Sequence, residues 1–199
     1  KPIVLSSPAQ YLARLESRGH VVADVRLRRE RVREGVLAAA REAGGEAIIE
    51  DALLDEVTAL VEWPVPLVGH IDARFLELPP EVLIATIQDH QRYFPVRDAQ
   101  GALLPRFVFV ANIVSRDPAQ VRAGNERVVR PRLADSVFFY NQDRRQPLAA
   151  RCAALGTVTY QTQLGSLADR TTRVRLLAAG IAAALGADRA RAERAAELA

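Results

Sequence analysis

The pattern of apolar and polar residues predicts helices across the first half of the chain. Apolar side chains recur there at helical spacing in four segments. These segments are 9–18, 25–43, 50–61 and one that starts at Leu78-Pro79-Pro80-Glu81 and ends near residue 90. Asp24 is placed to cap the second helix, and Gly44-Gly45 to end it.

Four shorter apolar runs predict strands. They are 21–24, 64–71, 93–96 and 107–114. Prolines in the second run place it at the edge of a sheet, because proline lacks the N–H that a ladder needs. In the last run, Phe107 and Phe109 share one face while Val108 and Val110 share the other. Since both faces are apolar, we expect a central strand.

From about residue 118 to the end the pattern is helical. Pro131 is expected to interrupt one helix, Pro147 to open another, and a further helix follows Gly165. The apolar stripe of that last helix contains Leu167, Val174, Leu177, Ile181 and Leu185. The predicted fold class is therefore α+β, with an α+β part over about residues 1–115 and a helical part over 116–199.

Composition narrows the class of protein. The chain has 199 residues, a single cysteine and three dispersed histidines, so neither an intramolecular disulfide nor a cysteine-based zinc site is expected. No apolar run reaches the ~20 residues of a membrane-spanning helix, and no signal peptide opens the sequence. The chain lacks methionine even at position 1. We therefore expect a cytoplasmic piece of a longer protein, with no membrane contact and no metal site.

The formal net charge of +3 hides an uneven distribution. Residues 46–90 contain one basic and ten acidic side chains, whereas residues 91–145 contain ten basic and five acidic ones. All 27 basic residues except Lys1 are arginines, whose planar guanidinium suits phosphate, although a genome-wide arginine bias explains the same ratio. One surface is thus expected to attract phosphate backbones and another to repel them.

The densest polar patch lies near the middle of the basic stretch. Its candidate RNA-binding residues are Arg122, Asn125, Arg127, Arg130 and Arg132. Arginines bind phosphate through charge-assisted hydrogen bonds, and an asparagine adds neutral ones. The alternative is an internal network of ion pairs with Glu126 and Asp135. Just downstream, Phe138-Phe139-Tyr140 is expected to pack in the core rather than to stack on bases.

Two further groups of residues are candidates for recognition. His90, Gln91, Arg92 and Tyr93 form a polar and aromatic run, for which we favour a structural or recognition role over acid–base catalysis because no partner side chain is identifiable. Arg170 and Arg173 lie in the helix after Gly165 and are candidates for contact with RNA. For Arg170, the alternative is a packed stem with the charged head reaching water.

No motif forms a complete active site. The sequence lacks a glycine-rich phosphate loop, a Rossmann fingerprint, a Gly-x-Ser-x-Gly elbow and a His-Glu-x-x-His pair. We therefore assign no catalytic residue to this chain.

Five short blocks carry a family resemblance. They are Glu56–Pro64 (EVTALVEWP), Gln91–Val96 (QRYFPV), Ala123–Val128 (AGNERV), Arg130–Asp135 (RPRLAD) and Gln163–Ser166 (QLGS). In this order they resemble the beta subunit of the bacterial-type, heterotetrameric glycyl-tRNA synthetase. The likeness covers most of the chain, from the helix at Arg26 to its end. Each block alone is a weak signal, but the set is specific.

The resemblance implies how this chain works within a larger enzyme. The site that joins glycine to tRNA(Gly), with ATP and Mg²⁺, would lie on the separate alpha subunit, and this internal fragment of the beta subunit would hold no cofactor. It would bind tRNA(Gly) and support assembly with the alpha subunit. A B3/B4-like α+β module would come first, followed by helices that begin an HD-like all-α domain. No histidine follows residue 146, so the position of the HD motif would lie beyond Ala199.

Three hypotheses follow. The first is a non-catalytic tRNA-binding and assembly fragment of glycyl-tRNA synthetase. The second is a metal-dependent phosphohydrolase of the HD type, which would need histidine and carboxylate ligands that this sequence does not supply as a set. The third is an interaction module, whose acidic 46–90 segment docks another subunit without touching RNA.

Overall fold

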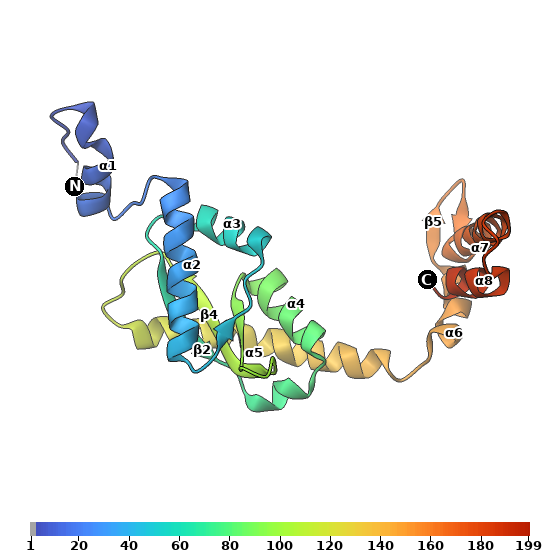
Figure 1. Cartoon of the computed structure of the whole chain (residues 1–199). Helices are drawn as coiled ribbons and strands as arrows, with labels where there is room; N and C mark the ends of the chain where they lie inside the picture. The colour runs from blue at the N-terminus through green and yellow to red at the C-terminus, as the bar shows by residue number, and fades with distance from the viewer. Residues whose placement is uncertain (1–2) are drawn as a thin grey trace. The chain divides into compact units, whose positions relative to one another are not determined.

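The structure is a computed structural model that describes residues 3–199. The chain folds into two compact units, one ending at Phe139 and one formed by Tyr140–Ala199 (Figure 1). The first combines helices with an antiparallel sheet, and the second combines helices with a short hairpin. The α+β class is thus confirmed as a mixture of helices and antiparallel strands.

The first unit is built on a four-stranded antiparallel sheet with the strand order β1-β3-β4-β2. Its strands are β1 (Glu46–Ala47), β2 (Val65–His70), β3 (Phe94–Arg97) and β4 (Leu103–Ala111). Strand β4 is interior and β2 lies at an edge, as their sequences predict. The two-residue strand β1 was not predicted, and the strand expected at 21–24 is wrong because these residues form no ladder.

Most helices of the first unit agree with the predicted segments, although the first segment is divided into short pieces and the short helix η3 was not predicted. They are η1 (Pro8–Gln10), α1 (Tyr11–Arg14), η2 (Leu15–Gly19), α2 (Val25–Glu42), α3 (Asp51–Leu60), η3 (Ala73–Glu77), α4 (Pro80–Gln91) and α5 (Pro118–Asp143). Asp24 caps α2 as predicted, because its carboxylate accepts from the backbone N–H of Arg26 at 2.8 Å. After α2 the chain turns at Gly44, whose φ of +82° favours glycine.

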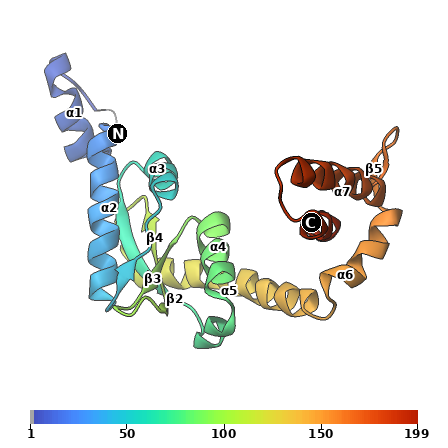
Figure 2. The same ribbon diagram turned by 45° about the vertical axis from the view of Figure 1, so that its right-hand side comes forward.

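Helices cover both faces of this sheet (Figure 2). Helices α2 and α3 pack on one face, where Val36, Leu54 and Val108 belong to one buried cluster. Helices α4 and α5 pack on the other, where Phe107 and Leu133 belong to a second cluster. The alternation predicted along β4 is therefore confirmed, since its phenylalanines and valines face different layers.

The edge strand β2 is protected from pairing with a further strand. Pro66 offers no N–H to the open side of the strand, and the backbone N–H of His70 donates to the carboxylate of Glu126 at 2.9 Å. On α2, a Cβ at Gly35 would come 2.6 Å from a ring carbon of Pro66. The glycine therefore allows α2 to approach the strand closely.

Helix α5 corrects one sequence expectation. Pro131 does not interrupt the helix but lies inside it. Proline removes one backbone hydrogen bond and costs roughly 3 kcal/mol in a helix interior. Val129 and Leu133, on either side of Pro131, are fully buried in the core. Their burial holds both halves of the helix against the sheet, which offsets that cost.

The second unit was expected to be all-helical, but it also contains a short β-hairpin. Its elements are α6 (Leu148–Arg151), η4 (Cys152–Thr157), β5 (Thr159–Gln161), β6 (Gly165–Ser166), α7 (Leu167–Ala184) and α8 (Arg189–Leu198). The hairpin of β5 and β6 was missed because its strands have only three and two residues. Among residues 3–199, no helix combines the length and apolar composition that crossing a bilayer requires.

The apolar stripe predicted for α7 is not buried within this unit. Leu177, Ile181 and Leu185 are 66%, 60% and 77% exposed. Instead, Ala179 and Ala182 are the buried residues of α7. These small side chains allow α7 to pack closely against its neighbour α8. The sequence prediction considered only the large apolar residues of α7, so it did not identify this face.

Candidate nucleic-acid interface

Helix α5 carries five of the predicted RNA-binding residues, but it directs them to different sides. Asn125 and Arg122 turn toward the body of the unit, whereas Arg127, Arg130 and Arg132 are exposed. At 100° per residue, Arg127 and Arg130 lie on neighbouring sides of the helix, while Arg132 is rotated about 140° from Arg127. The five residues therefore do not form one continuous patch.

Asn125 is held inside the protein. Its amide Nδ2 donates to the carbonyl of Val121 at 2.8 Å, and its Oδ1 accepts from the hydroxyl of Tyr93. Both ends of the amide are thus engaged, and they link α5 to the segment before β3. Contact of Asn125 with RNA stays a prediction.

Tyr93 belongs to an aromatic cluster on the sheet. Its ring stacks on Phe107 with centroids 5.0 Å apart and planes within 6°, and Phe109 lies 5.6 Å away. Burial raises the pKa of the Tyr93 hydroxyl, because the charged phenolate is poorly solvated there. The hydroxyl therefore remains the donor in its bond to Asn125 over the ordinary pH range.

Glu126 forms its ion pair with His70 and not with the arginines of α5, although it lines the same small pocket as Arg130. Its carboxylate accepts from the backbone N–H of His70 and lies 3.3 Å from Nδ1 of the same residue. Among residues 3–199, no ion pair joins Arg127, Arg130 or Arg132 to a carboxylate. The structure therefore does not contain the internal network that was the alternative to phosphate binding.

The remaining arginine of the patch is half-buried. Within the described chain, Nε of Arg122 is buried and has no hydrogen-bond partner. Arg122 points in the same general direction as the buried Val129 and Leu133, by helix geometry. This position favours packing of its stem, and its contact with RNA stays a prediction.

Two aromatic residues downstream contradict the expectation that they pack in the core. Phe138 and Phe139 are 60% and 61% exposed, and their rings meet edge to face at 5.4 Å. The core positions of this turn are instead taken by the partly buried Val137. A helix can direct only part of each turn inward, so adjacent bulky residues cannot all be buried.

Two residues of the run at the end of α4, Arg92 and Tyr93, make side-chain contacts within this fold. His90 is exposed and Gln91 ends the helix. Arg92 has a φ of +59°, which turns the chain toward β3, and its Nε pairs with the carboxylate of Glu56 on α3 at 2.5 Å. These contacts favour a structural role for Arg92 and Tyr93, and a role of the run in recognition stays a prediction.

The two candidates in the second unit have different surroundings. The guanidinium carbon of Arg170 lies 5.4 Å from the ring centroid of Tyr160 on β5. Arg173 uses Nη1 to donate to the carbonyl of Leu164, at 3.0 Å, in the turn of the hairpin. Arg170 therefore flanks an aromatic ring, whereas Arg173 fixes the turn.

A hydrogen-bonded cap places these residues. Ser166 and Asp169 form a reciprocal capping box at the start of α7, in which Ser166 N–H donates to the carboxylate at 2.8 Å. These hydrogen bonds from Ser166 lower the pKa of Asp169 below its ordinary value. Gly165 has a φ of +85° and lies against the Asp169 side chain, so the turn requires glycine.

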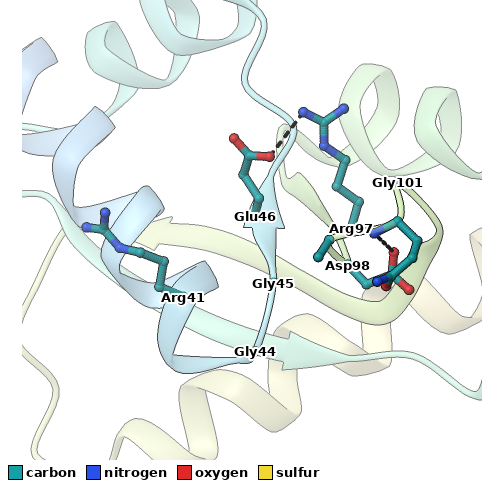
Figure 3. A pocket seen from close by; sticks show the side chains of 9 residues that line it. Arg41, Gly44, Gly45, Glu46, Arg97, Asp98 and Gly101 are labelled. Carbon is teal, nitrogen blue, oxygen red and sulfur yellow. Dashed lines mark hydrogen bonds and ion pairs between the residues drawn. The ribbon is translucent and has the colours of Figure 1, made fainter.

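An open pocket of the first unit is a weaker candidate for a functional site than the surface of α5. It has a volume of about 680 Å³ and lies between the end of α2, β1 and the β3–β4 turn (Figure 3). Arg97 pairs with Glu46 at 3.2 Å, while the Asp98 side chain accepts from backbone N–H groups of its own turn. Figure 3 shows the Arg41 side chain apart from this turn. The polar groups do not converge on one point, so we do not choose this pocket as the functional site.

Sequence reasoning missed several residues that connect the motifs. Glu56, His70 and Asn112 each contact a distant segment through their side chains. Asn112, for example, accepts from the backbone N–H of Trp63 at 2.8 Å. Asn112 follows a strand, and Glu56 lies within a sequence block, but neither signal indicates the partner. In residues 3–199, no three histidine, cysteine, aspartate or glutamate side chains are grouped so as to hold a metal ion.

Comparisons with known proteins agree on one family. The family model described as "Glycyl-tRNA synthetase beta subunit" matches residues 1–199. The glycine–tRNA ligase beta subunit of Marinobacter nauticus is 51% identical over 200 residues, which cover 100% of this chain and 29% of that protein. Those of Stutzerimonas stutzeri and Ectopseudomonas mendocina are each 53% identical, over 96% and 98% of this chain and 28% of theirs. The chain thus spans less than a third of these relatives.

Proposed function

The chain belongs to the glycyl-tRNA synthetase beta subunit family, and we propose that it is a non-catalytic part of that subunit which binds tRNA(Gly) and supports assembly. In this proposal the complete enzyme joins glycine to tRNA(Gly) in the cytoplasm. The alpha subunit is the partner that carries the catalytic site with ATP and Mg²⁺. The names of the relatives support the reaction, and the surface of α5 supports the contact with RNA.

The observation that carries the RNA contact is the pair of exposed arginines on α5 that form no ion pair in the described chain. Arg127 and Arg130 are exposed, three positions apart, and form no ion pair in the described chain, although Arg130 lines a small pocket with Asp72 and Glu126. The carboxylate nearest in sequence, Glu126, is engaged with His70. Because guanidinium groups that are not paired internally are free to bind phosphate oxygens, this side of α5 suits an RNA backbone.

The remaining RNA-binding candidates play smaller roles in the proposal. Arg132 lies on another side of α5, so a backbone that follows Arg127 and Arg130 would reach it less well. Asn125 and Tyr93 hold the helix on the sheet, which keeps the arginine pair in place. Arg170 provides a separate contact in the second unit.

We also propose the finer architecture that the resemblance implies. The sheet with its covering helices would correspond to the B3/B4-like module, and the second unit would begin the HD-like domain. The expected domain boundary near residue 115 assigns α5 to the helical part. However, α5 packs on the sheet through Val129 and Leu133, and the compact units divide after Phe139.

The acidic segment supports assembly as the second part of the role. Residues 46–90 have one arginine and ten acidic residues, and some of the acids are already paired, such as Asp51 and Asp55 with Arg29. Others, including Glu62, Glu81 and Asp89, are exposed. Such a surface repels RNA and suits a basic partner protein. A module that binds only the alpha subunit is therefore the alternative function.

The salt dependence of tRNA binding tests the proposal. In the complete alpha–beta enzyme, Arg127→Ala with Arg130→Ala should weaken binding of tRNA(Gly) and reduce the slope of log K against log salt by about 2, because two phosphate contacts are lost. The matched control is Arg74→Ala, which removes an exposed arginine from the acidic segment. If the double variant and the control bind alike, the α5 surface does not contact the RNA backbone.

A further inference from the structure

The hairpin of the second unit presents its loop in a fixed form. Strands β5 and β6 pair at Thr159–Ser166 and Gln161–Gly165. Oε1 of Gln161 accepts from the backbone N–H groups of Gln163 and Leu164, at 2.7 and 3.0 Å. These bonds, together with that from Arg173 to Leu164, fix the turn before any ligand arrives.

Tyr160 is the aromatic residue that this hairpin exposes. It lies between the paired positions Thr159 and Gln161, where the register of the β5–β6 ladder shifts. The residue is 46% exposed, and Arg170 flanks its ring at 5.4 Å. The contact with the guanidinium orients the ring, while a large part of it stays open to solvent.

The segment that contains Tyr160 has a positive net charge and many hydrogen-bonding groups. Between Val158 and Leu176 the sequence has three arginines and one acidic residue, Asp169. That single carboxylate is occupied by the capping box of α7. The turn itself contains Gln161, Thr162 and Gln163, all exposed.

We infer that Tyr160 and Arg170 form a platform on which an unpaired nucleobase of the bound RNA stacks. Aromatic rings stack on bases of any identity, and an arginine beside the ring binds the neighbouring phosphate. A fixed ring beside a guanidinium group matches these needs better than those of an apolar protein partner. The inference rests on the proposed binding of tRNA(Gly), and it adds a contact to unpaired nucleotides that is distinct from the backbone contact of α5.

The roles of the two arginines in this unit therefore differ. Arg170 contacts the ligand, whereas Arg173 is a positioning residue that acts through the carbonyl of Leu164. Arg170→Lys should retain charge but lose the planar contact with the ring, so it should recover only part of the affinity lost in Arg170→Ala.

Binding of a tRNA(Gly) transcript to the complete alpha–beta enzyme tests the platform. Tyr160→Ala should weaken binding by about 5-fold or more, which is the lower end of the effect of one stacked base. Tyr160→Phe keeps the ring and should bind within about 2-fold of the wild type. Unlike the α5 double variant, Tyr160→Ala should leave the salt slope unchanged, because stacking releases no counterions.

The outcomes separate this inference from the proposed function. If Tyr160→Ala binds tRNA like the wild type while the α5 double variant is impaired, the platform is wrong and the RNA-binding role stands. If Tyr160→Ala instead weakens association of the two subunits without tRNA, the surface docks protein and the inference is overturned. Equal melting temperatures of Tyr160→Ala and Tyr160→Phe would show that a loss of affinity does not come from unfolding.

Discussion

The hydroxyl of Tyr93 donates to Oδ1 of Asn125, and this bond joins the segment before β3 to helix α5. Each residue belongs to a different sequence block, and 32 positions separate them. The contact shows that these blocks meet in space to hold α5 on the sheet. It also explains why the helix presents Arg127 and Arg130 outward, since Asn125 and Glu126 fix its rotation.

Removing the Tyr93 hydroxyl tests this contact. Tyr93→Phe should lower the free energy of unfolding by about 1–2 kcal/mol, because Oδ1 of Asn125 then lacks its donor in a half-buried site. Chemical denaturation measures the change. An unchanged midpoint would show that the hydroxyl does not hold the helix.

Alkaline pH should destabilise the protein through the same residue. Burial raises the pKa of Tyr93 above its ordinary value of 10.0, so the folded state holds the proton more tightly than the unfolded state. This contribution is complete below the unfolded pKa and is lost as pH rises through the folded pKa. Denaturation from pH 9 to 11 should thus show a steeper loss for the wild type than for Tyr93→Phe, and parallel curves would contradict the assignment.

Removing the cap of α7 should lower stability. Ser166→Ala should lower the free energy of unfolding by about 1 kcal/mol, as for other lost caps.

The carboxylate of the same cap predicts a loss of stability at acid pH, opposite to the dependence of Tyr93. Because hydrogen bonds from Ser166 lower the pKa of Asp169, its contribution is present above the unfolded value of 3.8 and is lost as pH falls through the folded pKa. Thermal melts between pH 2 and 5 should lose this dependence in Asp169→Asn, which keeps a similar shape without the charge.

Two glycines should respond in opposite ways to alanine. At Gly45, a Cβ would overlap the carbonyl oxygen of Arg97, which belongs to the backbone and cannot rotate away. Gly45→Ala should therefore destabilise the protein by about 1–3 kcal/mol. Gly180, inside α7, has no atom within 4 Å of the added Cβ, and Gly180→Ala should stabilise it by about 0.5–1 kcal/mol. Equal effects on the melting temperature would refute this account of the packing.

The continuous core under α5 gives a further prediction. Leu133→Ala should cost about 2–5 kcal/mol because Leu133 is fully buried against the sheet. Phe138→Ala, on an exposed side of the same helix, should change stability by less than about 0.5 kcal/mol. Denaturant titration of the two variants compares them directly. Similar losses would mean that Phe138 is buried in solution.

Local sequence signals predicted the elements that depend on local physics. The cap at Asp24, the edge position of β2 and the two apolar faces of β4 follow from single residues and their spacing, and all are present. Pro131 led to a wrong prediction of a helix break. Its local cost is offset by the burial of Val129 and Leu133 against the sheet, and a local sequence pattern does not contain that information.

The contacts of the candidate site could not be predicted from the sequence. The arginines of α5 are visible in the sequence, but which of them are paired depends on where Glu126 points. That direction is set by His70, which lies 56 positions earlier in the chain. The exposed stripe of α7 has a similar cause, since periodicity identifies an apolar face but not what covers it.

Photo-crosslinking from α5 in the complete enzyme tests the central claim most directly. A photoreactive phenylalanine at position 127, compared with one at the exposed Glu81 of α4, would be irradiated with bound tRNA(Gly). We expect an RNA adduct from position 127 and none from position 81, because the latter lies in the acidic segment. Adducts from position 81 alone, or to the alpha subunit from position 127 in place of RNA, would contradict the assignment of α5 as the RNA-binding surface.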